Sequence, residues 1–273
     1  MKRTLGALAL ALTLGSGQAF AGNIVLTGHD NDLHQSADAN AQSLAALNFV
    51  RNGSALPVLT FDEGTQLTSQ LTHLGIAFTN VNPSAAGNIT DSLFDFSRFS
   101  AFAVASEQSC GGCDNSPASI ANIAAHSTAI ASFFNAGGGI YGLAGASDPL
   151  AYAYVPEAAS NPGGTPSPNG HVQTAAGAAL GIPAVNGDPT HNFFSQPGTG
   201  GLSALYQVVE TQGVGGTPLT VALANGTIIC TGSGCTVGGG GGGGGGTAVP
   251  EPASMALLGA GLLGLGLRRR KVT

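Results

Sequence analysis

The sequence has no tryptophan and almost no positive charge outside its two ends. Of its eight lysines and arginines, only Arg51 and Arg98 lie within residues 22–237, together with thirteen of the 14 acidic residues. Nucleic-acid binding depends on cationic contacts with phosphate groups, so this composition argues against a nucleic-acid partner. An acidic surface without lysine suits a divalent metal, or solubility outside the cell.

Aromatic residues are also scarce. They make up 6% of the chain, whereas glycine supplies 44 residues. Few aromatics argue against a broad stacking surface for sugars. The abundance of small, uncharged residues is more typical of an exported protein than of a cytosolic enzyme.

The N-terminus has the three parts of a secretory signal peptide. A basic start is followed by an apolar stretch, residues 5–14, and by small residues that end at Ala21. This order predicts a signal peptide over residues 1–21, with cleavage before Gly22. The alternative is a buried N-terminal helix. The apolar run is too short to span a membrane, and the small residues fit a signal peptidase, so both favour the signal peptide.

The C-terminus contains a second export pattern. Residues 253–267 form an uncharged run that is predicted to be a short transmembrane helix, below the ~20 residues of an ordinary span. The basic residues 268–271 follow it, and such residues stay on the cytoplasmic side. The sequence therefore predicts a weak, temporary anchor in the inner membrane, with the preceding chain outside.

A short motif precedes this run and arginines follow it. The residues concerned are Val249, Pro250, Glu251, Pro252, Arg268, Arg269 and Arg270. Together they resemble the PEP-CTERM sorting signal of Gram-negative bacteria, here over residues 249–273. The resemblance implies processing by an exosortase, a membrane peptidase, and transfer to the cell surface or to an extracellular matrix with exopolysaccharide. A plain C-terminal anchor is the alternative.

Nine consecutive glycines stand before the sorting signal, at residues 238–246. Polyglycine buries no side chains and loses much entropy on ordering, so residues 238–248 are predicted to be a flexible linker. Residues 22–237 remain, which is enough for one domain with its own core.

Within this domain, short apolar segments alternate with helical patterns. Strands are predicted at residues 23–27, 57–61, 76–81, 101–106, 140–144, 204–210 and 218–224, helices at 41–50, 65–74 and 119–136, a loop at 156–170, and a β-hairpin at 227–235. This alternation predicts an α/β fold, a flavodoxin-like parallel sheet with helices on both faces, followed by the C-terminal hairpin.

The four cysteines form two close pairs, Cys110 with Cys113 and Cys230 with Cys235. After export the expected state is a disulfide within each pair. Two alternatives stay open, a zinc site of four thiolates and a thioredoxin-like redox pair at Cys110 and Cys113.

The loop after the first strand, GHDNDLH, carries four ligand-type side chains: His29, Asp30, Asp32 and His34. Sites in open α/β sheets form at the carboxyl ends of strands. Carboxylates suit calcium or magnesium, and imidazoles suit zinc or another transition metal, whereas a solvated polar loop is the alternative. The EF-hand pattern fails. Further residues that could join this candidate metal or ligand site are Glu107, Asp148, His171, Asp188 and His191.

Residues 135–149, NAGGGIYGLAGASDP, carry a second resemblance, together with the segments VLTGHD and DPTHNFF. Over roughly residues 23–210 the chain resembles the class I glutamine amidotransferase-like superfamily, in the branch of trehalose-utilisation-type proteins. That resemblance implies a cysteine nucleophile on a strained turn. The matching turn, residues 142–146, has Ala144 at its centre, so a Cys–His amidase is not expected.

Two functions follow from these patterns. The favoured one is an exported, exosortase-processed protein of the cell surface or extracellular matrix with a non-catalytic amidotransferase-like domain. The alternative is a secreted metal-dependent hydrolase or carbohydrate-modifying enzyme that uses His29, Asp30, Asp32 and His34. The expected partners are signal peptidase, exosortase, the inner membrane before processing, and exopolysaccharide.

Overall fold

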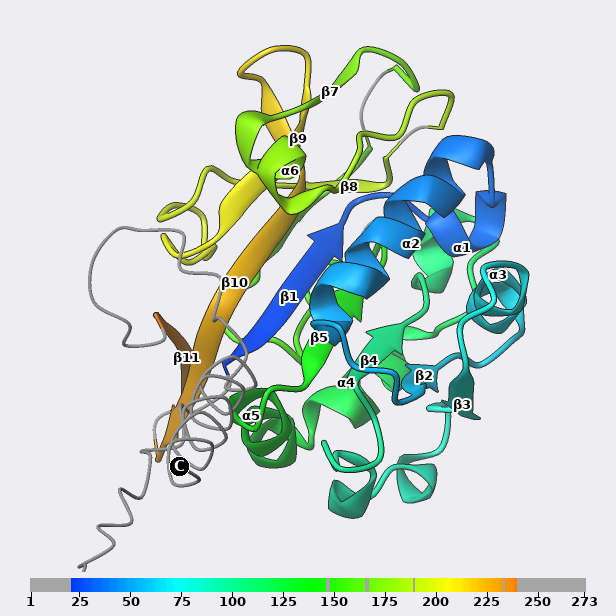
Figure 1. Ribbon diagram of the computed structural model, residues 1–273, viewed down its shortest axis with the longest axis vertical. Helices are drawn as coiled ribbons and strands as arrows, with labels where there is room; N and C mark the ends of the chain where they lie inside the picture. The colour runs from blue at the N-terminus through cyan, green and yellow to red at the C-terminus, as the bar shows by residue number, and fades with distance from the viewer. Residues whose placement is uncertain (1–20, 146–147, 165–166, 189, 233, 240–273) are drawn as a thin grey trace, which may run out of the picture. The chain divides into compact units, whose positions relative to one another are not determined.

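A nine-stranded sheet runs through the described part of this computed structural model, which covers residues 21–239 without 146–147, 165–166, 189 and 233 (Figure 1). Its strands are β1 (Gly22–Thr27), β2 (Val58–Phe61), β3 (Phe78–Val81), β4 (Ala101–Val104), β5 (Gly139–Gly142), β7 (His171–Gln173), β9 (Gln207–Gln212), β10 (Thr217–Thr231) and β11 (Gly234–Gly239). A separate two-stranded sheet pairs β6 (Ser160–Pro162) with β8 (Asn192–Phe194).

The sheet has a parallel part and an antiparallel part that meet at β1. Strands β3, β2, β4, β5 and β1 run parallel in that order. Beyond β1, the strands β10, β9 and β7 are antiparallel, and β11 pairs with the second half of β10. The predicted α/β class is confirmed. The predicted parallel sheet is parallel over β3, β2, β4, β5 and β1 only, and its antiparallel extension is larger than the predicted hairpin.

The strand order corrects the flavodoxin-like prediction. Flavodoxin-like sheets have the order 2-1-3-4-5, whereas the order here is β3-β2-β4-β5-β1. Strands β2 to β5 keep the flavodoxin-like arrangement, but the first strand of the chain occupies the place of the fifth. Local patterns identify strands without identifying their neighbours. Helix α2 (Ala37–Arg51), the second helix after β1, passes over β5 and β4 before the chain enters β2.

Six helices are described: α1 (Asn31–His34), α2 (Ala37–Arg51), α3 (Gln66–His73), α4 (Pro117–Ala124), α5 (Ser127–Asn135) and α6 (Ala175–Leu180), with 3₁₀ turns η1 (Ala86–Asn88), η2 (Asp91–Leu93) and η3 (Gln108–Cys110). Helices α2 and α3 pack on one face of the sheet, and α4 and α5 pack on the other. The prediction of helices on both faces is therefore confirmed. In the described part, no helix is long and apolar enough to cross a membrane.

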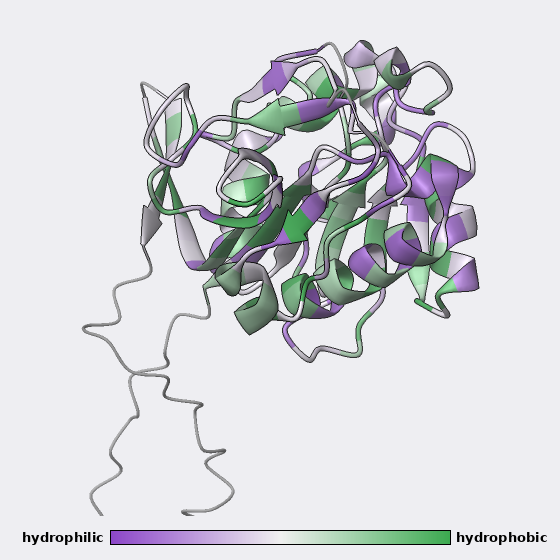
Figure 2. Ribbon diagram, turned by 90° about the horizontal axis from the view of Figure 1, so that it is seen from above, coloured by the Kyte–Doolittle hydropathy of each residue, from purple (hydrophilic) through white to green (hydrophobic). Residues whose placement is uncertain are grey.

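The two faces of the sheet differ in side-chain size. Side chains alternate along a strand, so Ile24 and Leu26 face α5 while Val25 faces α2. The face toward α4 and α5 collects a cluster of aromatic rings. The face toward α2 is lined by small residues, and a Cβ on Gly139 would lie 2.1 Å from Val50 O, so α2 packs directly on the backbone. Figure 2 shows the hydrophobic colours concentrated in the strands.

One predicted helix is divided in two. The pattern predicts a helix over residues 119–136, but it begins at Pro117 and is interrupted between α4 and α5. Ser116 caps the start with a side-chain hydrogen bond from Ser119 N. At the interruption, His126 Nδ1 lies 2.6 Å from an oxygen of Asp91, so a tertiary contact redirects the chain. The predicted loop at residues 156–170 likewise contains β6, because that segment pairs with β8.

The C-terminal hairpin is confirmed. β10 and β11 pair antiparallel with Cys230 directly opposite Cys235, and a disulfide joins them. β11 continues to Gly239, two residues into the run predicted as a linker. Most of the signal peptide, the rest of the linker, and the sorting signal with its transmembrane helix at residues 253–267 lie outside the described residues.

Candidate functional site

Three loops meet at the carboxyl ends of β1, β4 and β5. The amide of Ala144 donates to His29 O at 3.0 Å, and the amide of Glu107 donates to Ala144 O at 2.8 Å. These backbone bonds continue the sheet beyond its strands. They fix the loop after β1 beside the turn at Ala144, at the edge where sites form in α/β folds.

A fourth part of the chain, with Asp188 and residues 190–192, lies at the same edge. His191 N donates to Gly28 O at 2.8 Å. A Cβ on Gly28 would lie 2.0 Å from Asn192 O, so only glycine allows this approach. Gly28 therefore brings Asp188 and His191 to the loop after β1, although more than 150 residues separate them along the chain.

The loop after β1 is buried rather than solvated. His29, Asp30 and Asp32 each have a relative exposure of 0%. The one-turn helix α1 then places His34 one turn after Asp30. Because successive side chains leave this tight segment in different directions, His29, Asp30 and Asp32 enter three separate environments.

Asp30 and His34 join Asp188 and His191 in what we call the open cluster. Asp30 Oδ2 lies 3.4 Å from His34 Nε2 and 3.2 Å from His191 Nε2. His34 Nε2 also lies 3.5 Å from Asp188 Oδ1. The side chain of His34 is 44% exposed and that of His191 is 22% exposed, so the cluster opens to solvent.

The carboxylates of the open cluster are poorly satisfied. Asp30 Oδ1 and Asp188 Oδ2 are buried without a hydrogen-bond partner among the described residues. Burial and the Asp30 carboxylate raise the pKa of Asp188, against the opposing effect of the nearby histidines. Contact with Asp30 raises the pKa of His191. The arrangement therefore concentrates negative charge that protein atoms only partly balance.

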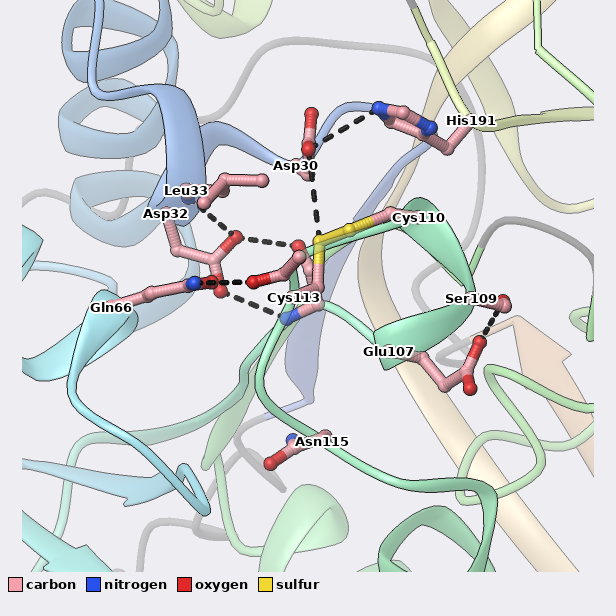
Figure 3. Close-up of a disulfide and its surroundings, with 12 residues drawn as sticks. Asp30, Asp32, Leu33, Gln66, Glu107, Ser109, Cys110, Cys113, Asn115 and His191 are labelled. Atoms are coloured by element: carbon pink, nitrogen blue, oxygen red, sulfur yellow. Dashed lines mark hydrogen bonds and ion pairs between the residues drawn. A yellow bond between two sulfur atoms is a disulfide. The ribbon is translucent and has the colours of Figure 1, made fainter.

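A disulfide forms one wall of the open cluster, as Figure 3 shows. Cys110 and Cys113 are linked, and Cys113 Sγ lies 3.7 Å from Asp30 Oδ2. A disulfide sulfur has no proton to donate, so this approach is a packing contact. Both disulfides are those favoured from the spacing, and all four cysteines are oxidised.

His29 belongs to a second group, the closed cluster, with His171 and Glu210. His29 Nε2 lies 3.2 Å from both carboxylate oxygens of Glu210, and the two imidazole rings are 5.2 Å apart. Glu210 also accepts hydrogen bonds from Thr220 Oγ1 at 2.6 Å, Val185 N at 2.8 Å and Gln42 Nε2 at 2.9 Å. Burial alone would raise the pKa of Glu210, but His29 and these donors hold it below its ordinary value.

The closed cluster leaves little room for a metal ion. Both ring nitrogens of His171 are directed at backbone carbonyl oxygens, Val185 O at 2.5 Å and Ser167 O at 3.2 Å, and not at a common point with His29 and Glu210. His29 Nδ1 is buried without a hydrogen-bond partner in the described part of the chain. The geometry is that of a hydrogen-bonded network which ties β9 and β10 to the loop after β1.

Asp32 enters a third environment. Its carboxylate accepts hydrogen bonds from Ser106 Oγ at 2.5 Å and Ser106 N at 2.8 Å. Burial raises the pKa of Asp32 to about 7, although both bonds from Ser106 lower it. Asp32 thus joins the loop after β1 to the loop after β4 and does not reach the open cluster.

Two further candidates lie apart from the open cluster. Glu107 Oε2 accepts a short hydrogen bond from Ser109 Oγ, and Figure 3 shows its side chain directed away from Asp30. Burial raises the pKa of Glu107. Asp148 accepts from Leu150 N at 2.8 Å within its own turn. The structure therefore brings together Asp30, His34, Asp188 and His191 from the predicted set, and not His29, Asp32, Glu107 or Asp148.

Sequence reasoning missed Glu210. It stands in the strand segment QVVETQ, where it was taken only as the end of a strand. The available signal was a carboxylate directly after two valines, in a strand predicted to be part of the sheet. Burying such a charge requires partners from elsewhere, here His29 and Gln42.

The turn after β5, at residues 142–145, corresponds to the turn that carries the cysteine nucleophile in the amidotransferase-like resemblance. Ala144 is fully buried and its backbone groups bond to His29 O and Glu107 N. Its side chain is a methyl group, and the nearby cysteines are in a disulfide. A thiol-based amidase reaction therefore has no nucleophile at this edge of the described domain.

Comparison with known proteins identifies the C-terminal segment. Residues 248–271 match the PEP-CTERM protein-sorting motif. The match implies an exported protein with a membrane-anchored sorting signal that an exosortase processes. Neither the curated proteins nor the solved structures give a match. The amidotransferase-like resemblance of the α/β domain remains a prediction.

Proposed function

We propose that the protein is displayed at the cell surface or in the extracellular matrix after exosortase processing, and that its α/β domain is non-catalytic. The observation that carries this proposal is the sorting motif at residues 248–271. The signal-peptide pattern at residues 1–21 adds the export step that such a motif requires. The two disulfides suit the oxidising conditions outside the cytoplasm.

The non-catalytic assignment rests on the turn after β5. Enzymes with a cysteine nucleophile need a thiolate beside an activating histidine. Ala144 supplies no such atom, and its backbone groups bond to His29 O and Glu107 N. The domain then acts after export as a binding or structural module, and exopolysaccharide is its expected neighbour in the matrix.

The test is the intact mass of the protein recovered from its own cells and from the medium. We expect a chain that starts at Gly22, ends near residues 250–252 and lacks the hydrogens of four thiols. A Glu251→Ala variant should keep its tail and stay with the membrane. A Thr247→Ala variant is the matched control, because it changes the linker and leaves the motif intact. A wild-type mass that continues through Thr273 would contradict the proposal.

A second candidate is a secreted metal-dependent hydrolase or carbohydrate-modifying enzyme. The open cluster favours it, because histidines and carboxylates at the carboxyl end of β1 can hold a metal that activates water. The ligands would then be Asp30, His34 and His191, with Asp188 beside His34. Chelator-sensitive hydrolysis of ester or glycosidic substrates by the native protein would support it, and inactivity with bound metal would leave the non-catalytic function.

A further inference from the structure

The donor atoms of the open cluster have the spacing of a coordination sphere. In a tetrahedral zinc site with bonds of about 2.0–2.1 Å, neighbouring donor atoms lie roughly 3.3–3.4 Å apart. Here Asp30 Oδ2 lies 3.4 Å from His34 Nε2 and 3.2 Å from His191 Nε2. Asp188 Oδ1 stands 3.5 Å from His34 Nε2. One ligand atom each from Asp30, His34 and His191 lie within 4.8 Å of one another, and Asp188 stands beside this group through its contact with His34.

Charge gives an independent reason for a cation at that point. Asp30 and Asp188 are 0% and 2% exposed, and each has one carboxylate oxygen without a hydrogen-bond partner among the described residues. Buried carboxylates require a partner charge or a coordinated metal. Residues 22–237 contain no lysine. Both arginines are engaged elsewhere, Arg51 with Ser100 and Arg98 over the ring of Phe99.

We propose that Asp30, His34 and His191 bind one divalent transition metal ion of the zinc class, with Asp188 beside the site. Two imidazoles with a carboxylate suit zinc and its first-row neighbours, whereas calcium takes six to eight oxygen ligands and magnesium keeps mostly water and oxygen. The charges of Asp30 and of the neighbouring Asp188 together match the two positive charges of the ion. The proposal holds whether or not the domain catalyses a reaction.

The position of the site allows an ion to reach it and gives it a structural effect. His34 is 44% exposed, so the cluster is accessible from solvent, while the Cys110–Cys113 disulfide closes its inner side. A bound ion would hold the loop after β1 against residues 188–191. With the disulfide formed, the sulfur atoms are not thiolate ligands, so the site depends on the side chains of Asp30, His34 and His191.

The test is a Co²⁺ titration of the full chain, purified under non-reducing conditions and stripped with a chelator. We expect saturation at one equivalent with a visible absorption band, displacement by Zn²⁺, and no displacement by excess Ca²⁺ or Mg²⁺. His34→Ala and His191→Ala should each weaken binding roughly 100-fold. His73→Ala is the matched control, because His73 is exposed at the end of α3 and outside the cluster.

A second measurement keeps the test valid if a variant folds poorly. The melting temperature of the wild-type chain should rise with Zn²⁺ concentration and level off at one bound equivalent, since a ligand that binds only the folded state stabilises it. Absence of saturable binding would overturn the proposal. Binding that survives in both H34A and H191A, or that falls equally in H73A, would also overturn it.

Discussion

Two clusters of histidine and carboxylate lie on either side of the segment Gly28–Asn31, and protein atoms satisfy them to different degrees. In the closed cluster, Glu210 receives hydrogen bonds from His29, Thr220, Val185 and Gln42. In the open cluster, Asp30 and Asp188 face two histidines and each keeps a buried oxygen without a hydrogen-bond partner in the described part of the chain.

The comparison shows that residue type alone does not identify a site. His29 and His34 come from the same loop, yet His29 completes an internal network while His34 faces solvent over a carboxylate. A network in which every polar group has a hydrogen-bond partner stabilises the fold. Buried carboxylate oxygens without such a partner can instead bind a ligand. Variants in and around the two clusters test this contrast.

The largest expected effect is on the closed cluster. Glu210→Ala should lower the free energy of unfolding by about 3–5 kcal/mol, because it leaves His29 and three donors buried without their acceptor. Asp188→Ala in the metal-free chain should cost less than about 1 kcal/mol, since it removes a poorly satisfied carboxylate. Chemical unfolding at pH 7 measures both, and equal losses would remove the distinction between the clusters.

Gly28→Ala should affect both clusters through the backbone. The new methyl group would meet Asn192 O at 2.0 Å, so residues 191–192 must move away from β1. We expect a loss of about 3 kcal/mol in unfolding free energy and weaker metal binding. Gly87→Ala is the control, because a Cβ at Gly87 has open space. A G28A chain with wild-type stability would show that this close approach does not hold the two segments together.

The buried carboxyl group of Asp32 should make the free energy of unfolding depend on pH. Burial raises its folded-state pKa from 3.8 to about 7, so its contribution to stability is complete below pH 3.8 and is lost as the pH rises through 7. Asp32→Asn stays neutral and keeps both contacts with Ser106. Its advantage over wild type should therefore grow from near zero at pH 4 to about 4 kcal/mol at pH 8.

The control for this pH series is Asp95→Asn. Asp95 is exposed, and hydrogen bonds from Ser97 lower its pKa, so its charge does not change over this range. The difference between D95N and wild type should stay constant from pH 5 to pH 8. A D32N difference that is equally constant would contradict the raised pKa of Asp32.

The smallest effect is expected at the exposed edge of the open cluster. In the chelated chain, His34→Ala should change the unfolding free energy by less than about 0.5 kcal/mol, because His34 is 44% exposed and surface ion pairs contribute little. His29→Ala, five residues earlier in the same loop and fully buried against Glu210, should cost about 2–4 kcal/mol. Thermal unfolding of the two variants side by side measures the contrast, and similar losses would contradict it.

Sequence patterns predicted the elements better than their arrangement. The apolar strands, the helices on both faces and the hairpin at Cys230 and Cys235 all depend on short stretches of chain. The place of β1 beside β5 depends on how α2 crosses the sheet, and the interruption at His126 depends on a contact with Asp91. Neither feature can be read from the spacing of apolar residues within a short segment.

The position of the candidate site could be predicted from the sequence, but the set of residues that meet there could not. The position of Asp30 and His34 at the end of a buried strand followed from the alternation of elements. The sequence did not show that Asp188 and His191, and not Glu107 or Asp148, join them. That outcome depends on the close approach of the chain at Gly28. The burial of His29 likewise depends on Glu210, which is distant in the sequence.

The most direct test of the export account is the native mass of the protein taken from the culture medium, measured before and after acid denaturation. The account predicts a chain that runs from Gly22 to the region of Pro250–Pro252, with both disulfides formed. It also predicts one divalent ion that is lost on denaturation. A chain that continues through Thr273 and remains with the cells would contradict export and processing, whatever metal it carries.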